Sequence, residues 1–139
     1  MTEAPTVNRE FLENITRQWI GLWTCPVDWS LFDTLHADRF QDLAAAGRPS
    51  TKEGFAAGLK LMTEAFPDLE TVVDDLVVDV ERQTVAVRWT SRGTNARSFL
   101  GVGPTGRLTE FRGIEIIEVC GGKIIRRWGE WDTSTHVGA

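Results

Sequence analysis

The spacing of the apolar residues changes once along the chain, after Asp68, and this change limits the folds that the chain can adopt. Before it, apolar side chains recur every three or four residues, which predicts helices. After it, valine-rich and alternating runs over Glu70–Val80 and Thr84–Ser91 predict strands. A chain with helices first and strands second is predicted to be an α+β domain with a curved antiparallel sheet packed on three N-terminal helices.

The first half carries start signals for these helices. Asn8 is a suitable N-cap for a first helix that runs to about Trp23. A second, shorter helix is expected from Trp29. Ser50 and Glu53 have the spacing of a capping box, in which a hydroxyl and a carboxylate satisfy free amides at the start of a third helix.

The second half ends in a hairpin. Gly121 and Gly122 separate two β-type runs, Leu108–Cys120 and Lys123–Asp132. A two-residue type I′ turn needs positive φ at both central positions, so adjacent glycines indicate a tight turn here. We expect the resulting curved sheet to close over the helices and to leave a cavity between them.

Length and charge exclude several classes of function. The 139 residues fit a single domain spanning 1–139, and the net charge of −5 lacks the basic surface that nucleic acids and anionic membranes require. The apolar runs are too short to span a bilayer, and no signal peptide is indicated at Met1. Two cysteines form no disulfide or metal motif, and the expected location is cytoplasmic.

The aromatic composition is uneven. Six tryptophans and seven phenylalanines occur without any tyrosine. Such rings can fill an ordinary core, or they can line a pocket for a flat apolar ligand, because they offer large contact areas with few rotamers. The sequence leaves both interpretations open.

Several short segments resemble, in order and spacing, the SnoaL-like polyketide cyclases. These segments are Ala65–Leu69, Val85–Arg88, Phe99–Val102, Pro104–Gly106 and Gly122–Trp128. The resemblance implies the cone-shaped α+β barrel shared with nuclear transport factor 2 and ketosteroid isomerase. It also implies a deep apolar pocket, no bound cofactor and assembly into a homodimer or homotetramer.

Two positions depart from the cyclase pattern. The resemblance implies an aspartate base directly after Trp128, but the next residue is Gly129. An assisting histidine on the preceding strand corresponds to Arg112, whose guanidinium stays protonated and cannot act as a base. The cyclase reaction therefore needs another carboxylate in this chain.

The last strand offers two such acids. With a period of two, Glu130 and Asp132 share a face with Trp128, and Arg88 and Arg112 follow on neighbouring strands. If Trp128 points into the cavity, these residues form a candidate catalytic cluster. The alternative is a structural ion pair between the acids and these arginines, and Arg126 and Arg127 are expected to face solvent.

The chain resembles the branch of this family that comprises hydroxylases from anthracycline-type antibiotic pathways. The resulting hypothesis is a cofactor-free hydroxylase of an aromatic polyketide, with a separate reductase as a further partner. The expected substrate-binding residues are Trp128, Trp19, Trp23, Phe40, Phe66, Phe99, Ile114 and Asn95. Asn95 also suits a turn.

Three alternatives remain open. The first is a cyclase whose base has moved, with Glu130 two residues after Trp128 as the best substitute. The second is a hydrolase resembling limonene epoxide hydrolase, which needs an arginine flanked by two acids. The third is a binding protein without catalysis. No metal site is predicted, because the two histidines lie far apart and His36 is expected at the surface.

Overall fold

A computed structural model describes residues 6–44 and 49–132 of the chain. This part contains three helices and one five-stranded sheet. The elements, in chain order, are α1 (Arg9–Gly21), α2 (Trp29–Leu35), β1 (His36–Asp42), α3 (Lys52–Ala65), β2 (Glu70–Asp79), β3 (Thr84–Thr94), β4 (Leu108–Cys120) and β5 (Lys123–Asp132). The predicted α+β class is confirmed.

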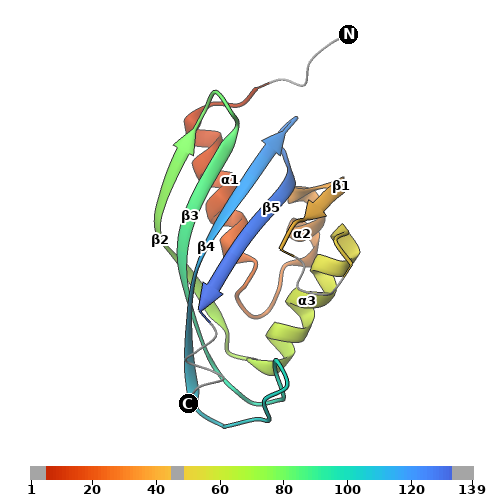
Figure 1. Cartoon of the computed structure of the whole chain (residues 1–139), viewed down its shortest axis with the longest axis vertical. Helices are drawn as coiled ribbons and strands as arrows, with labels where there is room; N and C mark the ends of the chain where they lie inside the picture. Colours follow the sequence, from red (N-terminus) through yellow and green to blue (C-terminus); the bar gives the residue numbers. More distant parts are fainter. Residues whose placement is uncertain (1–5, 45–48, 133–139) are drawn as a thin grey trace.

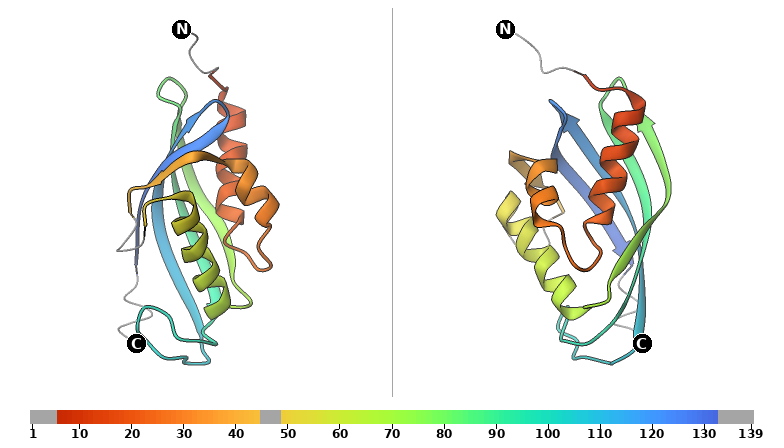
Figure 2. Two further views of the ribbon diagram at one scale, coloured as in Figure 1. Left: turned by 90° about the vertical axis from the view of Figure 1, so that its right-hand side faces the viewer. Right: turned by 180° about the vertical axis from the view of Figure 1, so that it is seen from behind.

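The strands form a curved sheet that does not close on itself. Their order is β1-β5-β4-β3-β2, with β2 to β5 antiparallel and β1 parallel to β5. All three helices lie on one face of this sheet, and the other face carries no element of the described chain (Figures 1 and 2). The space between the sheet and the helices is where the cavity lies.

The helix starts follow the capping chemistry that the sequence indicates. The Asn8 side chain accepts a hydrogen bond from the Phe11 amide at 2.9 Å, and α1 begins one residue later. At α3 the cap is Thr51 rather than Ser50, and its hydroxyl accepts from the Gly54 amide at 3.1 Å. The predicted capping box therefore begins one residue too early.

The strand β1 was not predicted. The second helix was expected to continue toward Phe40, but it ends at Leu35, and His36–Asp42 extends the sheet beside β5. His36, Phe40 and Asp42 are buried, whereas the residues between them are more exposed. Tertiary contacts with β5 thus override the weak strand propensity of this segment.

The β4–β5 hairpin has the predicted bounds and turn. Gly121 and Gly122 have φ values of 60° and 78°, as a type I′ turn requires. The pairing register shifts once, between Glu118 and Val119, so that β5 carries an extra residue there. This β-bulge decides which residues of β4 and β5 face one another near the cavity.

Most aromatic side chains fill the core. Phe55 and Phe66 are fully buried, and Phe55 stacks on Trp19 with ring centroids 6.0 Å apart. Phe40 also lies in the core, 2% exposed. No helix in the described part of the chain is long and apolar enough to cross a membrane.

Candidate active site

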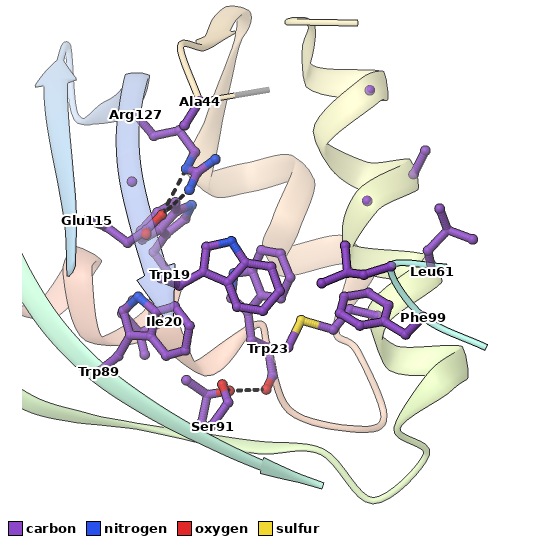
Figure 3. A pocket seen from close by; sticks show the side chains of 18 of the residues that line it. Trp19, Ile20, Trp23, Ala44, Leu61, Trp89, Ser91, Phe99, Glu115 and Arg127 are labelled. Atoms are coloured by element: carbon purple, nitrogen blue, oxygen red, sulfur yellow. Dashed lines mark hydrogen bonds and ion pairs between the residues drawn. The ribbon is translucent and has the colours of Figure 1, made fainter. Parts of the chain in front are cut away.

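A cavity of about 330 Å³ lies between the concave face of the sheet and helices α1 and α3 (Figure 3). This volume is at the small end of the range for small-molecule sites. Aromatic rings form much of its wall: Trp19, Trp23, Trp89, Phe99 and Trp131. The pocket interpretation of the aromatic composition therefore holds alongside the core interpretation.

Small residues on α3 provide part of the room. Gly54, Ala57 and Gly58 line the cavity from one face of the helix, and Leu61 continues this face toward solvent. They recur at the three- and four-residue spacing of a single helix face. The side chains that pack α3 into the core, such as Phe55 and Leu59, project from other positions.

A buried ionic cluster occupies one part of the cavity wall. Arg127 on β5 donates from Nε to Glu115 Oε1 at 2.9 Å and from Nη1 to Asp42 Oδ1 at 2.7 Å. Its Nη2 also contacts Glu115 Oε1. Glu115 on β4 and Arg127 line the cavity, while Asp42 at the end of β1 is fully buried. Within the described part of the chain, Arg127 thus bridges two buried carboxylates.

The Glu115 carboxylate lies in the space that a side chain at position 129 would occupy. Gly129 pairs with Glu115 across the β4–β5 ladder. A Cβ atom added at Gly129 would overlap both carboxylate oxygens of Glu115 and Nη2 of Arg127. A glycine at this position therefore admits a carboxylate from the neighbouring strand.

Glu115 has the properties of a poised proton acceptor. Burial raises the pKa of its carboxyl group above the ordinary range, and this effect exceeds the opposing influence of Arg127, through its charge and hydrogen bonds, and of the Trp89 indole. Its Oε2 accepts no hydrogen bond from the described residues. A raised pKa makes a carboxylate a stronger base than it is in water, which is a property of carboxylates that act as general bases.

His36 supports the cavity wall from behind. The indole nitrogen of Trp19 donates to His36 Nε2 at 2.9 Å, and His36 Nδ1 lies 2.7 Å from the Phe32 carbonyl. The carbonyl can only accept, so Nδ1 carries the proton and the ring is neutral. Burial lowers the pKa of His36 to about 4. The expectation of a surface histidine is therefore wrong.

Three of the predicted substrate-binding residues line the cavity: Trp19, Trp23 and Phe99. Phe40 and Phe66 are core residues outside its lining. Asn95 is fully buried, and its backbone bonds to Arg107 and Gly106 hold the base of the loop that follows β3. This location agrees with the turn interpretation of Asn95.

The remaining predicted residues lie on the outward face of the sheet. The condition that Trp128 points into the cavity is not met: its side chain is 41% exposed and is not part of the cavity lining, and Ile114 on β4 is 54% exposed. The four residues predicted to be catalytic lie beside Ile114 around a shallow hollow on this face: Arg88, Arg112, Glu130 and Asp132. The structure brings them together, but not in the cavity.

The arginines of this region exchange their expected roles. Arg112 is exposed and pairs with Glu110 at 2.9 Å, an acid that the structural interpretation did not name. Arg127, expected to face solvent, is 6% exposed and lines the cavity. Arg126 does face outward and pairs with Glu118 at 2.6 Å.

The sequence contained a signal for Glu115, because this acid lies between Ile114 and Ile116 in an otherwise apolar run.

Within the described residues, no group of three or more histidine, cysteine and acidic side chains could hold a metal ion. The polar groups of the cavity are carboxylate, guanidinium and hydroxyl groups, the last from Thr71 and Ser91. Such a set can move protons and stabilise developing negative charge on a bound carbonyl compound.

A family model described as SnoaL-like polyketide cyclase matches residues 13–137. Comparison with curated protein sequences finds no match. Among solved structures, TsrD from Streptomyces laurentii superposes with a TM-score of 0.82 at 20% identity, over 93% of either chain.

Two further structures carry descriptions of activity. IdmH from Streptomyces antibioticus, described as a candidate polyketide cyclase, has a TM-score of 0.76 at 26% identity, over 91% of this chain and 96% of IdmH. AclR from Streptomyces galilaeus, described as a candidate hydroxylase, has a TM-score of 0.80 at 18% identity, over 94% of this chain and 96% of AclR. The likeness to AclR and TsrD is a likeness of fold.

Proposed function

Since the chain belongs to the SnoaL-like polyketide cyclase family, we propose that it is an enzyme that closes a ring of an aromatic polyketide, with Glu115 as the base. The observation that carries this proposal is the position of the Glu115 carboxylate in the space beside Gly129. The acid that the family pattern places after the tryptophan of the last strand is thereby supplied from β4. The base has moved across the ladder rather than along β5.

The cluster provides both requirements of an aldol ring closure. Glu115 takes a proton from the carbon next to a substrate carbonyl, and the C–H electron pair delocalises onto the carbonyl oxygen as an enolate. Arg127 has five N–H donors, of which three are used within the cluster by the described residues, so two remain to stabilise that oxygen. The carbanion then attacks a second carbonyl of the same molecule, and Glu115 returns the proton to the new alkoxide.

The surrounding rings prepare the substrate and the base. Trp19, Trp23 and Trp89 offer flat apolar surfaces to an aromatic ligand. Such a ligand displaces water from the cavity, which strengthens the electrostatic interactions between Arg127 and the enolate. The same desolvation keeps the pKa of Glu115 raised, so that the carboxylate is a stronger base than in water.

The test is turnover of candidate aromatic polyketides, followed by mass spectrometry of the product. We expect Glu115→Gln to lower turnover at least about 100-fold, because general-base catalysis contributes at least that much. A matched control is Glu118→Gln, which breaks a similar Glu–Arg pair with Arg126 on the outward face and should retain turnover. Full activity of Glu115→Gln would contradict the proposal.

The product mass separates ring closure from hydroxylation. Both reactions can start from the carbanion that Glu115 generates. In hydroxylation the carbanion would add to dioxygen, and a separate reductase with NADPH would supply two electrons to reduce the hydroperoxide to an alcohol and water. A new ring at unchanged mass, or with loss of water, supports the cyclase. A gain of one oxygen that depends on the reductase supports the hydroxylase.

A second candidate follows from the acids on both sides of Arg127. An arginine flanked by two acids was expected only for a hydrolase resembling limonene epoxide hydrolase, and Asp42 and Glu115 supply this arrangement. Such an enzyme would add water across an epoxide of an apolar substrate. Incubation with epoxides in ¹⁸O-labelled water tests it, since the diol product would carry one labelled oxygen.

A further inference from the structure

A second polar site lies in the cavity, away from the ionic cluster. Thr71 on β2 and Ser91 on β3 face each other across the ladder, and both line the cavity. Glu115 on β4 pairs with Val87 on β3, and Val87 lies four residues before Ser91 along β3. Four residues of strand span about 13 Å, so the two polar sites are separated by about the length of a small fused-ring system. Figure 3 shows Trp89 between Ser91 and Glu115.

At this site Ser91 donates a hydrogen bond to Thr71, and Thr71 donates one to the Trp23 carbonyl. Thr71 Oγ1 lies 2.6 Å from the Trp23 carbonyl oxygen and 2.5 Å from Ser91 Oγ. The carbonyl has no hydrogen, so the single hydroxyl hydrogen of Thr71 must point at Trp23. The hydrogen between the two hydroxyls therefore belongs to Ser91. Both hydroxyl hydrogens are used, and only oxygen lone pairs are left for a ligand.

The Ser91 oxygen then needs a hydrogen-bond donor. Ser91 is 1% exposed and Thr71 is 8% exposed, so bulk water does not reach them freely. No described residue donates a hydrogen bond to Ser91 Oγ. A buried acceptor that stays unpaired costs about 1–3 kcal/mol, so a ligand without a donor at this point is penalised when it displaces water.

We propose that Ser91 is a specificity-determining residue that accepts a hydrogen bond from a hydroxyl group of the substrate. The substrate is accordingly a flat phenolic ketone, with its reacting carbonyl near Arg127 and its hydroxyl on a ring at the opposite end. The identity of the reacting end rests on the proposed function, but the preference for a donor at Ser91 does not.

A purely structural role for these hydroxyls makes a different prediction. Thr71 ties β2 to the segment after α1: its hydroxyl donates to the Trp23 carbonyl, and its backbone amide donates to the Thr24 hydroxyl oxygen at 3.2 Å. Ser91 adds nothing to this connection beyond its bond to Thr71. If the pair served only to hold the fold, its removal would lower stability without changing which ligands bind.

The experiment compares two ligands of nearly equal size by equilibrium dialysis, at about pH 6 to keep the phenol protonated. The probes are 2-hydroxyanthraquinone and 2-methylanthraquinone. We expect the wild-type protein to bind the hydroxy compound about fivefold more tightly, the effect of a net hydrogen bond of about 1 kcal/mol. In Ser91→Ala the ratio of the dissociation constant of the methyl compound to that of the hydroxy compound should fall to one or below one. Thr71→Val frees the Ser91 hydrogen and should also reduce the ratio.

Thr90→Val is the matched control, because Thr90 lies on the same strand and its hydroxyl bonds to Asp74 at 2.5 Å on the outward face. The ratio of the two dissociation constants in Thr90→Val should equal that of the wild type. Equal binding of both probes by the wild type, failure of both to bind, or a ratio unchanged in Ser91→Ala would overturn the inference. Glu115→Gln should keep the ratio. If it keeps both the ratio and full turnover, the proposed function fails while the role of Ser91 stands.

Discussion

His36 shows how a single buried side chain sets the acid stability of this molecule. Both of its ring nitrogens are engaged, one by the Trp19 indole and one by the Phe32 carbonyl. Protonation of Nε2 would break the bond to Trp19 and place a charge among aromatic rings. The folded state therefore resists protonation, whereas the unfolded chain takes up a proton at the ordinary histidine pKa of about 6.5.

The sign of the resulting pH dependence follows from this difference. The pKa of His36 is about 4 in the folded state, so between about pH 6.5 and pH 4 the unfolded state binds more protons. The stability that neutral His36 contributes is complete above that window and is lost as the pH falls through it. We expect this group to remove about 2 kcal/mol of unfolding free energy between about pH 8 and pH 5.

The measurement is urea unfolding at both pH values for the wild type and for His36→Gln. Glutamine can keep both hydrogen bonds but does not titrate in this range. The loss on acidification should therefore be smaller in the variant by about the stated amount. Glu115 acts in the opposite direction, since its pKa is raised, but it is present in both proteins and cancels in the comparison. Equal losses would show that His36 is not the cause.

At the scale of the element, β5 separates two sets of side chains by alternation. Arg127, Gly129 and Trp131 line the cavity. Glu130 and Asp132 lie on the outward face, near Arg112 and Arg88. The acids of β5 thus lie on the face of the sheet opposite to the cavity. Their removal tests whether the reaction takes place in the cavity rather than on the outward face.

We expect the double variant Glu130→Gln, Asp132→Asn to keep turnover within about twofold of the wild type. Exposed substitutions away from packed features usually change stability by less than about 0.5 kcal/mol, so the protein should also unfold at nearly the same denaturant concentration. Steady-state kinetics on the same polyketide as for Glu115→Gln provides the comparison. A loss of turnover as large as that of Glu115→Gln would return the base to the outward face.

The hairpin also shows what sequence can and cannot predict. Its bounds were predictable because adjacent glycines permit only a tight turn. Which face of β5 turns inward was not, since both faces carry tryptophan and arginine: Trp128 with Arg126 outward, and Trp131 with Arg127 inward. Alternation shows which residues share a face, but here it gives no preference for either face.

The β-bulge is one reason why Glu115 was not among the residues predicted to be catalytic. Counted from the turn without a bulge, Glu115 would oppose Trp128 rather than Gly129. The register shift between Glu118 and Val119 brings Glu115 opposite Gly129. One extra residue in a strand leaves no clear pattern in a single sequence, and the buried, polar β1 that supplies Asp42 leaves none either.

At the scale of the whole molecule, the outward face of the sheet is an apolar surface with a charged border. Ile114, Ile116 and Trp128 are 54%, 40% and 41% exposed, and charged side chains of both signs surround them, including the Arg126–Glu118 pair. Contiguous apolar surface of this kind marks an association site. Mixed charges suit a two-fold contact, in which each group meets its opposite on the partner.

We expect the protein to form a homodimer through this face. Ile116→Lys places a charge at its centre and should shift the species in sedimentation velocity toward the monomer. Leu61→Lys adds the same charge at an exposed position on α3, across the molecule, and should leave the assembly unchanged. A wild-type protein that sediments as a monomer at about 100 µM, well above typical homodimer dissociation constants, would contradict this expectation.

The alternation of side chains along β3, β4 and β5 has a consequence for how such a protein can change over generations. Neighbouring codons specify separate properties: one residue faces the cavity, and the next lies on the outward face of the sheet. Ile114 and Glu115 are adjacent in the chain and serve opposite sides of the sheet. Selection can therefore change which proteins bind the outward face without changing the cavity. It can equally change the cavity lining to fit another ligand while the outward face stays the same.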